Sequence, residues 1–244
     1  IKRGVKEEQW LNEGRSEYAP TILGYNDNYK GSYLEKRVNE FLAHPSDALL
    51  DWRGRSADHA SSNMFIHYLV DRYGEKILSK IVDANAVGAE SINEALSALG
   101  QSDRFQDVFY DWILTVYMNG SVNGEERFKY KTQNLSFGNL HVLPSTIFRV
   151  YDNNSSGASF VVDNWSGQWH RFVPGAIGEE TTLHIRVSSP RKDSLYFPYI
   201  ISDFFGGTEV KSWDLRQGNT FSVNGFGATV SSGVVAPIFA NKDT

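Results

Sequence analysis

The sequence predicts an α+β protein with two domains, a helical bundle followed by an antiparallel β-sandwich, and three observations lead to this prediction. Through residue 118, apolar side chains recur every three or four positions, as they do on helices that bury one face. From residue 145 onward, short apolar runs are separated by Gly, Asn, Asp and Pro. A polar, Gly-containing connection at 119–127 divides the two patterns. We therefore expect domains at 1–122 and 123–244, and 244 residues suffice for two cores.

The helical half divides at residues that begin or end helices. Ser32 is suited to cap the start of one helix, and Pro45 follows its end. Gly74 and Gly100 are suited to end two others, because glycine adopts the left-handed conformation at a helix terminus without strain. These signals predict helices at 8–20, 33–44, 58–73, 75–84, 90–99 and 102–118. The last of them has the strongest apolar face.

The second half contains short runs with the composition of strands. Strands are expected within 145–152, 159–165, 181–189, 195–202, 209–215, 220–226 and 234–240. Seven short strands in this length favour a sandwich or jelly roll. Trp165, Trp169 and His170 could form an aromatic platform for sugar rings, but strand aromatics more often fill a sandwich core.

Composition excludes several classes of function. The chain has 29 acidic and 24 basic residues, a formal charge of −5, and no basic run, so nucleic-acid binding is not expected. It contains no Cys, which excludes disulfides and thiolate metal sites. The most apolar stretch, 109–118, is much shorter than the roughly 20 residues that a membrane-spanning helix needs. No membrane span is therefore expected.

The opening helix carries two carboxylates on its apolar side. Glu13 and Glu17 lie one helical turn apart and share a face with Trp10 and Tyr18. A carboxylate that faces inward costs several kcal/mol unless it is paired, hydrogen-bonded or bound to a metal. Three interpretations follow: a buried ion pair, a hydrogen-bonded structural pair, or a metal ligand with a neighbouring acid that orients another ligand.

The segment WLNEGRSEYA, residues 10–19, resembles the part of gluzincin metallopeptidases that supplies the third zinc ligand. In this thermolysin-like clan, the other two protein ligands come from an HExxH motif on an earlier helix. The resemblance implies that Glu13 is a zinc ligand and that Glu17 supports a zinc-binding His. It also implies Zn²⁺ as cofactor, a peptide or protein substrate, and a secreted bacterial protein, either extracellular or on the cell surface.

The resemblance continues more weakly through SSNMFIHYLVDRYG and FQDVFYDWILTVYM, which are similar to the helices that follow the ligand helix in such enzymes. It therefore implies that the helical half is a thermolysin-like C-terminal helical subdomain, with the β-sandwich as an accessory domain. The resemblance also implies a catalytic role for His59, because it begins the helix that in such enzymes can carry a His or Tyr donating a hydrogen bond to the oxyanion of a tetrahedral intermediate. Tyr18 and Tyr25 are further candidates for such a donor. An ordinary exposed or capping role for His59 is the alternative.

HExxH itself is missing, because none of the six His residues is followed by another His four positions later. We interpret the chain as the C-terminal portion of a zinc peptidase whose HExxH segment precedes Ile1. Without that segment, it is expected to bind zinc weakly or not at all and to be inactive alone. The alternative is a non-catalytic surface-binding or glycan-binding protein on a degenerate peptidase scaffold. An HExxH motif encoded upstream of Ile1 would distinguish the two.

Overall fold

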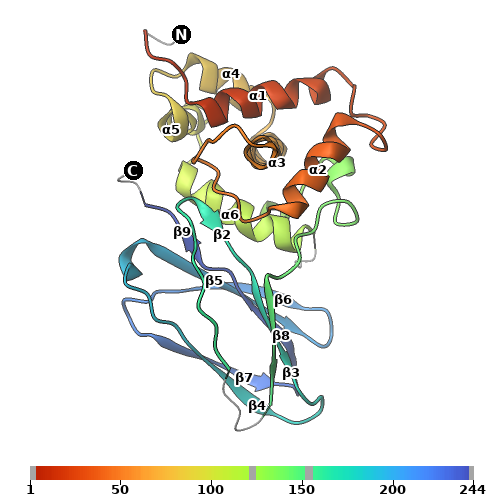
Figure 1. Cartoon of the computed structure of the whole chain (residues 1–244), viewed down its shortest axis with the longest axis vertical. Coiled ribbons are helices and arrows are strands. Elements are labelled where there is room, and N and C mark those ends of the chain that lie inside the picture. Colours follow the sequence, from red (N-terminus) through yellow and green to blue (C-terminus); the bar gives the residue numbers. More distant parts are fainter. Residues whose placement is uncertain (1–3, 121–124, 152–155, 242–244) are drawn as a thin grey trace. The chain divides into compact units, whose positions relative to one another are not determined.

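The computed structural model describes residues 4–120, 125–151 and 156–241. The chain forms two compact units, which are described separately (Figure 1). The helical unit comprises Ile1–Gly120 and Glu126–Val142, and the β unit comprises Ser121–Glu125 and Leu143–Thr244. Residues 126–142 thus belong to the helical unit by their contacts, although the sequence places them after the connection. Within the described residues, no helix is long and apolar enough to span a membrane.

The helical unit contains helices close to the positions that the sequence predicts. They are α1 (Gln9–Ile22), α2 (Tyr33–Ala43), α3 (Ser56–Tyr73), α4 (Lys76–Asp83), α5 (Gly88–Ala98) and α6 (Phe105–Met118). The hydroxyl of Ser32 accepts a hydrogen bond from the backbone N–H of Glu35, as its expected capping role requires. Gly74 follows α3 with a φ of 81°, a conformation that favours glycine.

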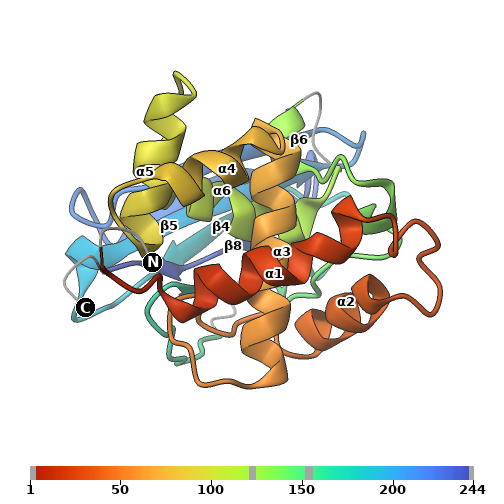
Figure 2. The same ribbon diagram turned by 90° about the horizontal axis from the view of Figure 1, so that it is seen from above.

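Helix α1 crosses α3 and packs closely against it at Gly14 (Figure 2). A Cβ atom added to Gly14 would lie 2.9 Å from a side-chain carbon of Ile66 and 3.1 Å from the carbonyl oxygen of Ser62. Glycine is therefore required at this crossing, because any side chain would push the two helices apart. The close approach brings the carboxylate of Glu17 to the first turns of α3.

An aromatic cluster fills the core of the helical unit. Trp10 of α1, Phe65 of α3 and Phe105 of α6 lie within 6.1 Å of one another by ring centroids. Trp112 extends the cluster from Phe65 to Phe41 of α2. Each of these side chains is at most 2% exposed. Burial of so much apolar surface stabilises the arrangement of the helices and hence the position of the residues on α1 and α3.

Residues 126–142 fold back onto the helices through buried hydrogen bonds. The side-chain amide of Asn119, which has a left-handed backbone, donates to the carbonyls of Leu135 and Leu140 and accepts from the N–H of Tyr130. The hydroxyl of Tyr130 donates to the carbonyl of Met64 in α3. The segment includes two short 3₁₀ helices, η1 (Glu126–Phe128) and η2 (Gln133–Leu135). It forms one side of a pocket at the end of α3.

The described residues of the β unit form a mixed sheet of nine strands. They are β1 (Thr146–Val150), β2 (Ser166–Gly167), β3 (His170–Pro174), β4 (Thr181–Arg186), β5 (Leu195–Asp203), β6 (Thr208–Trp213), β7 (Thr220–Phe226), β8 (Val230–Val235) and β9 (Ile238–Phe239). A third short 3₁₀ helix, η3 (Lys192–Ser194), precedes β5. Apolar side chains from β4, β5, β7 and β8 form its buried core, with Leu183, Phe197, Phe226 and Val235 among them.

The prediction of antiparallel pairing is correct for most neighbours but wrong for two. Strand β5 pairs antiparallel with β6, β8 and β9, and β3 pairs antiparallel with β8. Strands β1 and β3, however, are parallel, and β7 joins β8 through one parallel pair, Phe226 with Val230. Residues 151–169 separate β1 from β3, which is long enough for the crossover that parallel pairing requires.

The region around the Trp residues of the β unit differs from the prediction. Residues 159–165 are not a strand, whereas His170–Pro174 form β3. Trp169 is fully buried and Trp165 is 6% exposed, so these two rings belong to the interior. They cannot form an exposed platform for a sugar ring, and the interpretation of both rings as buried residues is confirmed, although neither lies in a strand.

Candidate functional site

The carboxylate of Glu17 is the centre of a buried polar network between α1, α2 and α3. Its side chain is 8% exposed. Arg37 of α2 donates from Nε to Oε2 and from Nη2 to Oε1, each over 2.7 Å, in the two-point geometry that suits a guanidinium and a carboxylate. The hydroxyl of Tyr33 donates to Oε1 over 2.8 Å. The inward-facing carboxylate at 17 is therefore an ion pair and a hydrogen-bond acceptor at once.

His59 joins the same network from the first turns of α3. Its Nδ1 lies 3.0 Å from Oε1 of Glu17, and its ring packs edge-on against Trp52 with 4.7 Å between centroids. The side chain is 26% exposed. Within the described residues, Nε2 has no hydrogen-bond partner and is not buried. The ring is thus held at one nitrogen and accessible at the other.

The pairing of Arg37 with Glu17 is not predicted from the sequence, although the position of Arg37 indicates that it is buried and needs an acidic partner. Arg37 lies on the face of α2 that carries Leu34, Val38 and Phe41, all buried. A cation in an apolar stripe requires an acidic partner, by the argument that applies to Glu13 and Glu17. Burial alone would lower the pKa of Arg37, but hydrogen bonds to Glu17 and Glu40 outweigh it and raise the pKa above its usual value. Arg37 therefore stays charged and fixes Glu17.

Glu13, the predicted zinc ligand, lies one turn before Glu17 on α1 and is partly exposed. The side-chain amide of Gln9 donates to its Oε1 over 2.6 Å. No other hydrogen bond or ion pair engages this carboxylate within the described part of the chain. The carboxylate of Glu13 can therefore accept further hydrogen bonds or bind a cation, whereas most of the acceptor positions of Glu17 already have donors.

Tyr18, the other candidate catalytic residue, is 5% exposed and packs in the core. Its ring meets that of His67 edge-on, with 4.6 Å between centroids. Burial, followed by the charges of Asp71 and Glu75, raises the pKa of Tyr18 to about 12, so its hydroxyl keeps its proton near neutral pH. In contrast to Glu17 and His59, the structure gives this hydroxyl no hydrogen bond among the described residues.

The described residues contain no group of three or more His, Asp or Glu side chains placed to hold a metal ion. Glu13 fits the part of one carboxylate ligand, and the described residues do not supply the three protein ligands that a zinc site needs. Comparison with protein-family models, with curated proteins and with solved structures found no match. The geometry around Glu13, Glu17 and His59 is therefore the basis for a functional proposal.

Proposed function

We propose that the helical unit is the portion of a secreted bacterial zinc metallopeptidase that supplies the third zinc ligand, Glu13. One observation carries the proposal: Glu13 is a partly exposed carboxylate on a rigid helix, one turn before a buried glutamate whose position is fixed by Arg37. A ligand on a rigid element supported by an acid that orients a neighbour is what a zinc site requires. The two His ligands and the general base would come from an HExxH segment outside this chain.

In this proposal, each residue of the network has a separate task. Glu13 would offer an oxygen to the metal, which in such sites polarises a bound water. Oε1 of Glu17 accepts from Tyr33, Arg37 and His59, whereas Oε2 has Arg37 as its single donor among the described residues. Oε2 can accept one further N–H, the bond that would orient a metal-binding imidazole.

His59 is suited to act on a developing oxyanion through Nε2. Because Nδ1 faces the carboxylate of Glu17, it carries a proton, and Nε2 can donate only when the ring is doubly protonated. The partly exposed ring is held between Glu17 and Trp52, so its Nε2 has a fixed direction. A peptide or protein would be the substrate.

The test begins with the gene that encodes this chain. Translation upstream of Ile1 is expected to reveal HExxH, and the longer protein is expected to retain one zinc per chain after dialysis, measured by metal analysis. Glu13→Gln should abolish zinc retention and proteolysis together. Glu17→Gln removes an orienting group and should weaken zinc binding about 10–100-fold.

Glu180→Gln is the matched control, because Glu180 is exposed and lies in the β unit, outside the network. Thermal unfolding of each variant separates loss of metal from loss of fold. A complete gene without HExxH, or full zinc retention by Glu13→Gln, would contradict the proposal. The first result would favour a non-catalytic surface-binding protein.

One observation in the β unit supports the surface-binding alternative. Phe205, 92% exposed, and Ile177, 77% exposed, lie on two loops. Both loops are hydrogen-bonded to the turn before β8, through Phe204 to Thr229 and through Gly178 to Gly227. Exposed apolar side chains gathered on neighbouring loops are typical of contact surfaces. Phe205→Ser should reduce binding to a surface partner and leave zinc retention unchanged.

A further inference from the structure

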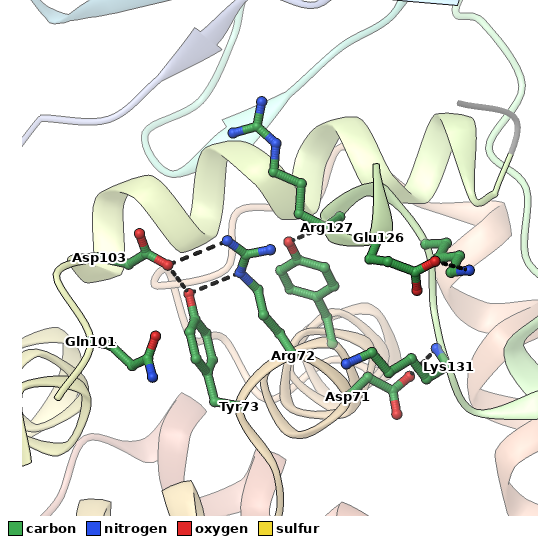
Figure 3. A pocket seen from close by; sticks show the side chains of 10 residues that line it. Asp71, Arg72, Tyr73, Gln101, Asp103, Glu126, Arg127 and Lys131 are labelled. Carbon is green, nitrogen blue, oxygen red and sulfur yellow. Dashed lines mark hydrogen bonds and ion pairs between the residues drawn. The ribbon is translucent and has the colours of Figure 1, made fainter. Parts of the chain in front are cut away.

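A second polar site lies at the other end of α3 from His59. Thirteen residues separate His59 from Arg72, which corresponds to about 20 Å along a helix. A pocket of about 330 Å³ opens there, between the end of α3, the loop before α6 and residues 126–131 (Figure 3). This volume is at the lower end of the range for small-molecule sites. Nothing in the proposed peptidase function uses this pocket.

The acidic residues of the pocket already have hydrogen-bond donors. Asp71 accepts from the backbone N–H groups of Lys131 and Thr132 and from the hydroxyl of Thr132, over 2.7–3.0 Å. These three bonds are internal to the fold and hold residues 131–132 against α3. The negative charge of Asp71 is thus spread over donors that cannot leave it without local unfolding.

The other two carboxylates are also engaged. Asp103 accepts from the hydroxyl of Tyr73 over 2.6 Å and from Nη2 of Arg72 over 3.3 Å. Glu126 pairs with Lys129 over 2.5 Å. Figure 3 shows the bonds of Asp103 on one side of the pocket and those of Glu126 on the other. A cationic ligand would have to compete with each of these partners.

The donors of the pocket, by contrast, are incompletely matched. Arg72 is oriented by bonds from Nε to Tyr73 and from Nη2 to Asp103, but its Nη1 makes no hydrogen bond within the described residues and is not buried. The ammonium of Lys131 and the amide of Gln101 likewise have no hydrogen-bond or ion-pair partner in that part of the chain. A site with spare donors and engaged acceptors selects for a ligand rich in acceptors.

The charges around the pocket nearly balance. Four cationic side chains and three acidic ones line it, and Asp111, which is not part of the lining, pairs with Arg72 and with Arg127 over 3.6 Å. Among the described residues, the ammonium of Lys131 is the one cation of the pocket without an ion pair. From these contacts we propose that the pocket binds a small molecule through a carboxylate or phosphate group, whose oxygens accept from Nη1 of Arg72 and Nζ of Lys131. The guanidinium supplies a fixed direction, and the ammonium supplies a mobile charge. Gln101 is placed to contact the remainder of the ligand.

Titration of the ¹⁵N-labelled 244-residue chain with inorganic phosphate, and separately with succinate, tests this proposal. Sodium chloride keeps the ionic strength constant, so that screening does not change. Saturable shifts of backbone amides at 71–73, 101–103 and 126–131 are expected with at least one of the two anions. Saturation by phosphate alone, by succinate alone or by both supports the site and identifies the group it accepts.

Lys131→Met should weaken the anion affinity about tenfold, the effect of losing one charge-assisted hydrogen bond. Lys30→Met is the control, because Lys30 is an exposed lysine in the loop between α1 and α2. Arg72→Lys keeps the charge but loses the fixed fork, and should weaken binding as well. Absence of saturation with both anions, or an equal loss in Lys30→Met and Lys131→Met, would overturn the proposal. Lys131 is exposed, so thermal unfolding of its variant should match that of the wild type.

Discussion

The charged side chains at the two ends of α3 differ in how completely they are paired and buried. At the first turns, one buried carboxylate, Glu17, receives Arg37, Tyr33 and His59, and the charges lie inside the fold. At the last turn, Arg72 is only partly matched, and the ammonium of Lys131 is exposed. The first arrangement is closed and fixes the positions of its members, whereas the second retains donors for something that is not part of the fold.

This comparison shows that burial determines whether a charged residue contributes mainly to stability or stays available for ligand binding. A buried ion pair is costly to break, because the partner left behind keeps its charge without solvent. A more exposed pair contributes less to stability. The side chains of Arg72 and Asp103 are 22% and 33% exposed, against 8% for both Arg37 and Glu17. Substitutions should therefore reduce stability mainly at the first end of α3 and ligand binding mainly at the last.

The largest effect is expected from Arg37→Leu, which leaves Glu17 buried without its cation. Loss of one partner of a buried pair costs about 3–5 kcal/mol, and both side chains are 8% exposed. Urea unfolding followed by far-UV circular dichroism measures the change in the helical unit. The double variant Glu17→Leu/Arg37→Leu should recover much of the loss. A cost below about 1 kcal/mol for the single variant would place this pair among surface pairs and remove the contrast.

A smaller effect is expected between the two ends, where α1 crosses α3. Gly14→Ala introduces a Cβ atom 2.9 Å from the side chain of Ile66 and should cost about 1–3 kcal/mol by overpacking. Gly138→Ala is the control, because a Cβ there would meet no atom within 4 Å. The free energy of unfolding of the two variants should differ accordingly. Equal stability would mean that the helices can separate without cost, so that α1 does not hold Glu17 rigidly.

A pH-dependent effect is expected from His67, which is fully buried in the middle of α3. Burial lowers its pKa to about 3, whereas an unfolded His titrates near 6.5. Between these values only the unfolded chain binds the proton, so stability is complete above pH 6.5 and falls as pH decreases. The loss approaches about 1.4 kcal/mol per pH unit.

His67→Gln should remove this contribution, which is obtained by comparing the slopes of the two proteins from pH 6.5 to 4.5. The comparison of slopes matters because burial raises the pKa of Asp111 to about 6, and this opposes the effect of His67 in the same range. Asp111 is common to both proteins and cancels in the difference. Parallel slopes would show that the ring of His67 gains a proton without unfolding.

Helices such as α2 and α4 were predictable because they bury one face, and that periodicity is local. Helix α3 is buried on nearly all sides and was predicted mainly from the residues that begin and end it. The expected helix at 102–118 corresponds to α6, which begins three residues later, at Phe105. Strand β3 was missed because WHRF carries large residues at every position and does not alternate. Parallel pairing of β1 with β3 was also missed, since the partner of a strand is decided by contacts far away in sequence.

The sequence predicts that both carboxylates of α1 in the candidate site face inward. This is confirmed for Glu17, whereas Glu13 is partly exposed. The sequence does not identify Arg37 as the partner, because twenty residues and a loop separate the two side chains. The position of Arg37 in an apolar stripe was a signal of its own. Only the tertiary structure shows that Glu17 and Arg37, two charged residues on the apolar faces of different helices, form a pair. The roles of Glu13, Glu17 and His59 in zinc chemistry remain predictions.

The edge-on contact between Trp52 and His59, 4.7 Å between ring centroids, gives the network an optical reporter. A charged imidazole against an indole ring would interact with its π-electrons. The emission of Trp52 therefore reports on the position of the His59 ring, which Glu17 holds at Nδ1. Any event that moves Glu17, such as a hydrogen bond from a metal-binding imidazole to Oε2, would change the emission wavelength or intensity of Trp52.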